Sequence, residues 1–345
     1  MTDYGLVASV GQGYMGNSVA FGATRNPMQT ANSARQQGVP CKMPANSDPC
    51  HAASGPVELT SCELAKHLPH VAWLAGVPWS TSERVLRPLS MPHVSIDVDR
   101  AQLREVMSQH GAVLATWTTD WDMPGVSEWW WVCCDDPNYQ VDLVKSSRGR
   151  RDIRKGLREC EVRRVDRHEF GRLAYPIYSA AARSYGRTPP TEESFVRGAS
   201  STTYPGIEFW GAFCHDRLAA FSTCRVVDNA VSLANARSDP DLEKHDPNAA
   251  LFYGICRHYM ENGLRYVTNG SRTLWHPTRI NDLLEKLGFL KVYCRVNVEV
   301  SPVVRIVDRL RLAAWGRYVG LPWLFRRRWM QLEACHRLLR IAETF

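Results

Sequence analysis

Residues 230–300 alternate between strand-like and helix-like patterns, and this alternation constrains the fold more than any other feature of the sequence. The order predicts a strand, a polar loop, an amphipathic helix, a short strand, a second helix and a long strand, at 230–236, 238–248, 249–261, 266–268, 280–287 and 289–300. The first helix carries Leu251, Phe252, Ile255 and Tyr259 at helical spacing. This alternation favours an α/β fold built on a mixed sheet.

The junction between the polar loop and the first helix is the most informative point in this run. Asp246 can cap the helix through its side chain, and Pro247 suits the first helical position, where an N–H would be unpaired anyway. A helix that begins directly after a strand presents free N–H groups and the positive end of its dipole. The junction therefore predicts a site for a diphosphate.

Three motifs around this junction carry a resemblance to a known family. They are Pro247-Asn248 at the helix start, the basic run RRDIRKGL at 150–157, and LLEKLGF at 283–289. Together they resemble the GNAT acyltransferase superfamily over residues 128–300, in particular the large branch that includes the Fem-type peptidoglycan bridge transferases. The resemblance implies a GNAT-like α/β fold with two lobes, acyl-CoA as co-substrate and an amine as acceptor.

Composition at the two ends and the resemblance in the middle predict a division of the chain. We expect a low-order leader, a first GNAT-like lobe, a basic connecting helix, a second lobe that carries the acyltransferase site, and a basic amphipathic tail. Their ranges are 1–57, 58–145, 146–167, 168–300 and 301–345.

Donor-binding residues are expected at the ends of the strands and in the loop before the first helix, because ligands of open α/β sheets bind beyond the carboxyl ends of the strands. The candidates are Arg237, Lys244, His245, Asn248, Ala249, Ala250, Asn269 and Ser271. No metal-ligand constellation is present, so we expect no metal.

Proton transfer has no single obvious donor in this chain. Many GNAT enzymes use a tyrosine four residues before the glycine of the LGF ending, and here that position is Leu284. His276 follows the short strand and has the ordinary pKa range of a proton shuttle. For His276 a structural or surface role is the favoured alternative. Asp239 and Glu208 are candidate bases.

The remaining pattern predicts further elements on both sides. We expect helices at 59–68 and 100–110, strands at 93–98, 112–117 and 128–134, helical structure followed by a substrate loop within 168–204, and a hairpin at 207–213 and 218–227. The segment 128–134 (EWWWVCC) is nearly continuously apolar, which is typical of a buried strand.

Two segments hold most of the positive charge. Residues 145–167 carry ten basic and four acidic residues, and 301–345 carry nine arginines and three acids, against a net charge of +7 for the whole chain. Either segment can be a solvated helix face. The alternatives are a phosphate-attracting wall for the first segment and an interfacial helix on anionic lipid for the tail, which would favour a lipid-linked acceptor. Sequence-specific nucleic-acid binding is disfavoured, because aromatic residues are not interleaved with the first basic run.

Several function classes are disfavoured. No apolar run reaches the roughly 18 residues of a membrane span, and the first residues lack a secretory signal pattern. The eleven cysteines form no C-x-x-C pair, so we expect reduced thiols in a cytoplasmic protein. The G-x-G-x-x-G at 11–16 lacks the acid expected about 20 residues on, and Cys41, Cys50 and His51 lack a second ligand pair.

These observations predict an N-acyltransferase that moves an acyl or aminoacyl group to an amine on a small molecule or a lipid-linked acceptor. It would be cytoplasmic, with possible peripheral contact with the inner membrane surface through 301–345. The alternative is a catalytically inactive GNAT-like protein that binds a membrane surface or RNA through its basic segments.

Overall fold

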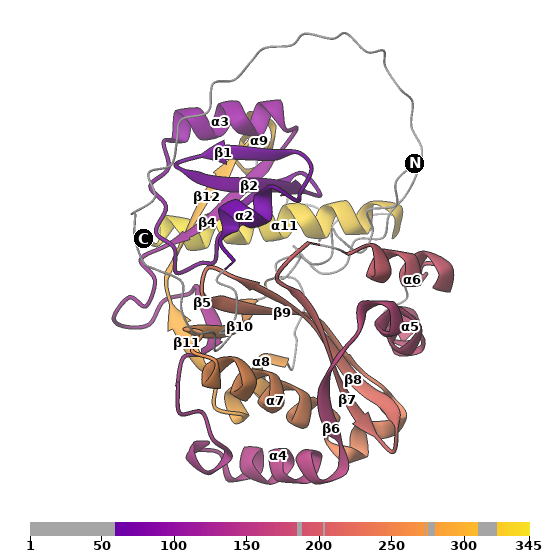
Figure 1. Cartoon of the computed structure of the whole chain (residues 1–345). Helices are drawn as coiled ribbons and strands as arrows, with labels where there is room; N and C mark the ends of the chain where they lie inside the picture. The colour runs from indigo at the N-terminus through magenta and orange to yellow at the C-terminus, as the bar shows by residue number, and fades with distance from the viewer. Residues whose placement is uncertain (1–58, 185–187, 203, 273, 275–279, 310–322) are drawn as a thin grey trace, which may run out of the picture.

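The computed structural model describes residues 59–345 apart from 185–187, 203, 273, 275–279 and 310–322. The described chain forms two mixed sheets (Figure 1). The five-stranded sheet has the order β1 (Val71–Leu74), β2 (Val77–Ser82), β3 (Val85–Pro88), β4 (Leu114–Thr119) and β12 (Arg295–Val300). The seven-stranded sheet has the order β11 (Leu290–Tyr293), β5 (Trp130–Cys134), β10 (Tyr266–Ser271), β9 (Ala230–Ser238), β8 (Arg217–Val227), β7 (Ile207–Cys214) and β6 (Glu161–Val165). The expected mixed α/β class is confirmed, and the two sheets agree with the expected two lobes.

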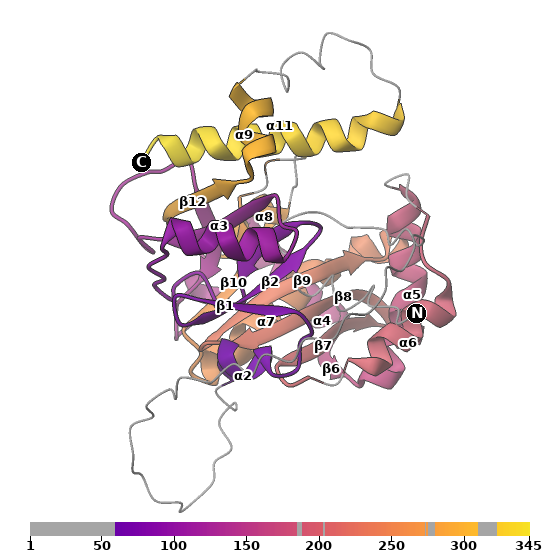
Figure 2. The same cartoon turned by 90° about the horizontal axis from the view of Figure 1, so that it is seen from above.

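Helices cover both faces of the seven-stranded sheet (Figure 1). One face packs against α7 (Pro247–Glu261) and α8 (Ile280–Lys286), and the other against α5 (Arg167–Ser184) and α6 (Glu192–Ser201). The remaining helices are α2 (Ser61–Ala65), α3 (Arg100–Gln109), α4 (Ser147–Glu159), α9 (Pro302–Arg309) and α11 (Trp323–Glu343), with short 3₁₀ turns η1 (Val141–Leu143) and η2 (Pro240–His245). In Figure 2, α11 runs past β12, and Leu338 and Ile341 near its end are buried with residues of the five-stranded sheet.

The prediction of one long strand at 289–300 is wrong. The chain leaves the seven-stranded sheet after β11 and enters the five-stranded sheet as β12, with Cys294 between them. In the same way β5, which precedes the basic helix α4, belongs to the seven-stranded sheet. The five-stranded sheet therefore contains β12 from the C-terminal part of the chain, and the seven-stranded sheet contains β5 from the N-terminal part. The domain ranges given above stay a prediction.

The prediction of a strand at 93–98 is also wrong, although Ile96 and Val98, two residues apart, both face the core. Ile96 is buried and Val98 packs beside it, but no neighbouring strand pairs with this segment. Conversely, β1, β2 and β3 were not predicted. The turn between β2 and β3 places Glu83 and Arg84 at φ of 49° and 65°, and neither residue belongs to the Asn-Gly type that marks such a turn in a sequence.

The start of α7 differs in detail from the expectation. Pro247 lies in the first turn as predicted, but Asp246 adopts a left-handed conformation (φ 54°, ψ 41°) and makes no side-chain cap. Its carboxylate instead pairs with Lys155 of α4, with 3.0 Å between Oδ2 and Nζ.

The expectation that all cysteines are reduced is corrected by the structure, which joins Cys160 and Cys214 in a disulfide. Glu161 at the start of β6 pairs with Phe213 near the end of β7. The two cysteines therefore face each other in the next row of the ladder, although 54 residues separate them in the sequence. The free cysteines of the described chain are buried or half-buried, namely Cys62, Cys133, Cys134, Cys224, Cys256, Cys294 and Cys335.

Asp228, in the turn between β8 and β9, ties the two lobes together. Its Oδ1 accepts a hydrogen bond from the N–H of Ser61 (2.8 Å), and its Oδ2 accepts one from the N–H of Met91 (3.0 Å). Its own N–H donates to the carbonyl of Leu59 at 2.8 Å. One side chain therefore satisfies two backbone donors of the N-terminal segment.

Replacing Asp228 with alanine is expected to lower the free energy of unfolding by about 2–3 kcal/mol, because two partly buried N–H groups lose a charged acceptor. Asp228→Asn keeps one acceptor oxygen, so we expect about half that loss. Urea unfolding followed by tryptophan fluorescence measures both losses, with Asp97→Ala, at an exposed position between β3 and α3, as the control. Equal stability of all three variants would contradict a stabilising role for the hydrogen bonds that the Asp228 side chain accepts.

Candidate functional site

The parallel strands β9 and β10 separate soon after they meet. They pair over only three rows, from Ala230 opposite Tyr266 to Ser232 opposite Thr268. Beyond these rows β10 remains on β5, with Ser271 opposite Trp131, and β9 remains on β8. The β9–β10 divergence, as we call it, thus opens in the middle of the seven-stranded sheet.

Irregular backbone lies on both sides of the divergence. Asn235 of β9 has a φ of 51°, beside a register shift in the β8–β9 ladder. Gly270 of β10 has a φ of 98°, and its N–H turns back to Thr268 Oγ1 at 3.1 Å. A bulge bends its strand. Beyond Ser232, the edge of β9 that faces β10 has no neighbouring strand among the described residues.

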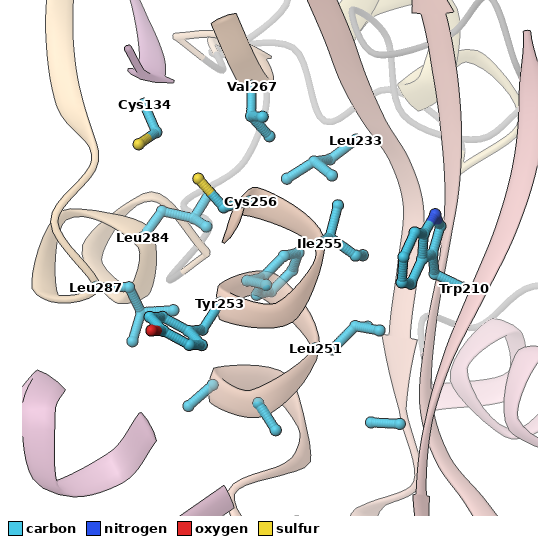
Figure 3. Close-up of a cluster of buried hydrophobic side chains, with 14 of the residues drawn as sticks. Cys134, Trp210, Leu233, Leu251, Tyr253, Ile255, Cys256, Val267, Leu284 and Leu287 are labelled. Atoms are coloured by element: carbon cyan, nitrogen blue, oxygen red, sulfur yellow. The ribbon is translucent and has the colours of Figure 1, made fainter. Parts of the chain in front are cut away.

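The core beneath the divergence is formed around α7 (Figure 3). Leu251 and Ile255 of α7 pack with Leu233 of β9 and Val267 of β10. Leu284 of α8 is fully buried in the same cluster, near Cys256. The position at which many GNAT enzymes carry a tyrosine is thus an apolar core position in this chain.

The first turn of α7 follows the divergence and leaves two peptide N–H groups, those of Asn248 and Ala249, without an intrahelical acceptor. Asn248 also fastens the helix to the end of β9, because its Nδ2 donates to Ser238 Oγ at 2.9 Å. Helix α4 packs against this turn through Gly156, where an added Cβ would lie 3.1 Å from the nitrogen of Ala250. We call this first turn of α7 and the end of β9 next to it the α7 corner. Helix α4 thus covers one side of the α7 corner.

The predicted donor-binding residues separate into two groups. Arg237 follows the bulge of β9, and Asn269 and Ser271 lie on β10, so these flank the divergence together with Asn248. Lys244 and His245 lie in η2 and face α4: the Lys244 carbonyl accepts from Lys155 Nζ, and His245 Nδ1 lies 2.6 Å from Glu159 Oε2. The hydrogen bond with His245 is the main reason that the pKa of Glu159 is lowered.

Glu208 and Asp239, the candidate bases, are already engaged. Glu208 Oε2 accepts from Tyr259 Oη at 2.5 Å and pairs with Arg164 Nε at 3.0 Å. Asp239 pairs with Arg217 at 3.2 Å, and its Oδ1 accepts the N–H of Asp241 at the start of η2. These contacts favour structural roles, and a catalytic role for either stays a prediction. His276 lies outside the described residues.

A cavity of about 410 Å³ lies between the two sheets, and the sequence did not predict it. It reaches the divergence, because Ser232 and Gly270 line it. Tyr204, from the loop before β7, also lines it. The residues that line the cavity are spread along the sequence from Leu64 to Leu338, and no sequence pattern connects such distant positions.

The comparison with known families identifies the centre of the chain. Residues 147–272, from α4 to just beyond β10, match the family model described as an acetyltransferase (GNAT) domain. The chain contains a GNAT acetyltransferase domain. The diverging strands β9 and β10 belong to it, and α7 lies between them in the sequence.

The chain has distant likenesses among solved structures. The match with the crystal structure of FemX covers 67% of this chain and 86% of the FemX chain, at 9% sequence identity and a TM-score of 0.48. The C-terminal domain of a putative lysylphosphatidylglycerol synthetase from Agrobacterium fabrum (67% and 84%, 13% identity, TM-score 0.43) and L-PGS from Bacillus licheniformis (67% and 83%, 12% identity, TM-score 0.44) are similar at the same level. No curated protein matches the sequence significantly.

The tail beyond the GNAT domain packs in part on the protein. Ala334, Leu338 and Ile341 of α11 are buried, whereas Val303 and Ile306 of α9 are exposed. No helix in the described part of the chain combines the length and apolarity needed to cross a bilayer. Peripheral membrane contact through 301–345 stays a prediction.

Proposed function

We propose that the protein is an N-acyltransferase that uses acyl-CoA and an amine acceptor. The observation that carries this proposal is the β9–β10 divergence, which opens onto the cavity and is followed directly by the start of α7. Within a GNAT domain this arrangement suits a thioester that lies between the strands, with its carbonyl oxygen near peptide N–H groups along the edge of β9.

The reaction needs few side chains. The amine nitrogen attacks the thioester carbonyl, a C–N bond forms, the C–S bond breaks, the amine loses a proton and the CoA thiolate gains one. Tyr204 suits the second proton transfer: it lines the cavity, and burial raises its pKa to about 12, which keeps the phenol protonated at neutral pH. The phenol oxygen also has no hydrogen-bond partner among the described residues.

For the diphosphate of CoA we propose the open side of the α7 corner. The N–H groups of Asn248 and Ala249 supply donors there. Lys155 of α4 lies at the same corner, paired with Asp246. Among the residues predicted from sequence, we retain Arg237, Asn269 and Ser271 as contacts to the rest of the donor.

Donor binding is the direct test. Isothermal titration with CoA and acetyl-CoA should show binding to the wild type, and Asn248→Asp should weaken it at least tenfold, because a carboxylate then stands at the diphosphate. Asn138→Asp, on an exposed loop, is the matched control and should bind as the wild type does. Absence of binding to any acyl-CoA would overturn the proposal and favour an inactive protein that binds a membrane surface or RNA through its basic segments.

A further inference from the structure

The cavity between the sheets has a distinct chemical character on its GNAT-domain side. Ile207, Arg225 and Ser232 form a row across β7, β8 and β9, because Ile207 is opposite Arg225 and Arg225 is opposite Ser232. All three line the cavity. The row ends at the last paired rung of β9 and β10, so a molecule in the cavity lies beside the β9–β10 divergence.

The charged groups that line the cavity are of one sign. They are Arg87 of β3, Arg225 of β8 and Arg272 just after β10, with His70 at the rim, and the described lining contains no Asp or Glu. Arg272 has an acidic neighbour, Glu128, at 3.8 Å, but that carboxylate is 64% exposed and lies outside the lining. Arg225 contacts Met91, another residue of the lining, with 3.8 Å between Nη2 and Sδ. The cavity therefore favours an anion.

Buried polar atoms point to a ligand as well. Ser90 Oγ and Trp129 Nε1 belong to residues that are 6% and 4% exposed, both line the cavity, and neither atom has a hydrogen-bond partner among the described residues. A buried donor that lacks a partner lowers the stability of the folded state. A ligand with acceptor oxygens would satisfy these groups.

The rest of the wall is apolar. Leu89, Met91, Leu114, Trp117, Trp131 and Leu338 line the cavity. A fully hydrated anion such as inorganic phosphate would leave this surface uncovered. The wall instead suits an aliphatic or aromatic group attached to the anion.

We propose that this cavity binds the acceptor, and that the acceptor is a small amphiphilic amine that also carries an anionic group, such as an apolar α-amino acid. The anionic group lies among Arg87, Arg225 and Arg272, the apolar group lies against the tryptophans, and the amine faces the divergence. This assignment deepens the proposed function and rests on it.

Three probes that share a phenyl group separate the contributions of the carboxylate and the amine to binding. L-phenylalanine carries both groups, 3-phenylpropanoate carries only the carboxylate, and 2-phenylethylamine carries only the amine. Titration calorimetry on the full chain should show both carboxylates binding at least tenfold more tightly than 2-phenylethylamine. Arg225→Gln, and separately Arg87→Gln, should weaken binding of the two carboxylates roughly tenfold and leave 2-phenylethylamine unchanged. Arg340→Gln on α11, whose side chain is 57% exposed, is the matched control.

Equal binding of the three probes, binding of none, or carboxylate binding that neither cavity variant weakens would overturn the inference. CoA binding, measured in the same preparation, separates the two proposals. If CoA binds and the carboxylates do not, the acceptor assignment fails alone. If the carboxylates bind and CoA does not, the cavity is an anion site and the transferase proposal fails.

Discussion

Replacing Gly149 with alanine is expected to destabilise the protein by about 3 kcal/mol, although alanine favours a helix interior over glycine by about 1 kcal/mol. Gly149 lies in α4, where an added Cβ would stand 2.0 Å from the carbonyl oxygen of Lys286, a backbone atom at the end of α8. The helix must therefore move away from α8. Chemical unfolding measures the loss, and the sign of the effect separates close packing from helix propensity.

Gly156→Ala tests the other contact of α4. Its Cβ would lie 2.6 Å from the carbonyl oxygen of Asp246 and 3.0 Å from the Cβ of Ala250. We expect a loss of similar size and weaker CoA binding, because α4 and the start of α7 move apart. Arg148→Ala, on a side chain of α4 that is 68% exposed, is the control and should change stability by less than about 0.5 kcal/mol. Stability that rises in both glycine variants would show that α4 does not pack closely.

Replacing Ser232 with phenylalanine is expected to lower acyl transfer by roughly 100-fold, about 2.7 kcal/mol in the barrier. Ser232 is half-buried, lines the cavity and occupies the last paired row of β9. A phenyl group there fills the space between the divergence and the cavity, so the acceptor cannot approach the thioester. Release of CoA thiol, with acetyl-CoA and L-phenylalanine as substrates, measures the rate.

The Ser232 variant should retain CoA binding, because the start of α7 lies on the other side of the sheet from the cavity. Ser108→Phe, on the exposed face of α3, is the matched control and should transfer at the wild-type rate. A Ser232→Phe protein that binds CoA and remains fully active would show that the acceptor does not pass this point.

Many elements could be predicted from the sequence because their signals are local. The hairpin of β7 and β8, the helix α7 with its proline in the first turn, and the glycine stop at Gly288 each depend on neighbouring residues. The resemblance that indicated a GNAT domain also came from short motifs, and the domain match confirms it. The absence of a tyrosine at Leu284 was likewise visible, and the structure shows that position in the core.

Residues that look functional in a sequence often have partners that the sequence does not reveal. Glu208 is a candidate base as an isolated carboxylate, but folding brings Arg164 and Tyr259 to it. His245 is a candidate phosphate contact, but folding places it on Glu159 of α4. The sequence separates these partners by more than 40 residues, so only the fold could reveal the contacts.

The sequence by itself determined the type of domain, because helix starts, glycine stops and strand alternation act over a few residues. The tertiary structure decided which strands share a sheet, that Cys160 meets Cys214, and that α4 covers one side of the α7 corner. It also decided the cavity and its arginines, which come from β3, β8 and the end of β10. These features depend on contacts between distant segments, and such contacts exist only after the two sheets have packed together.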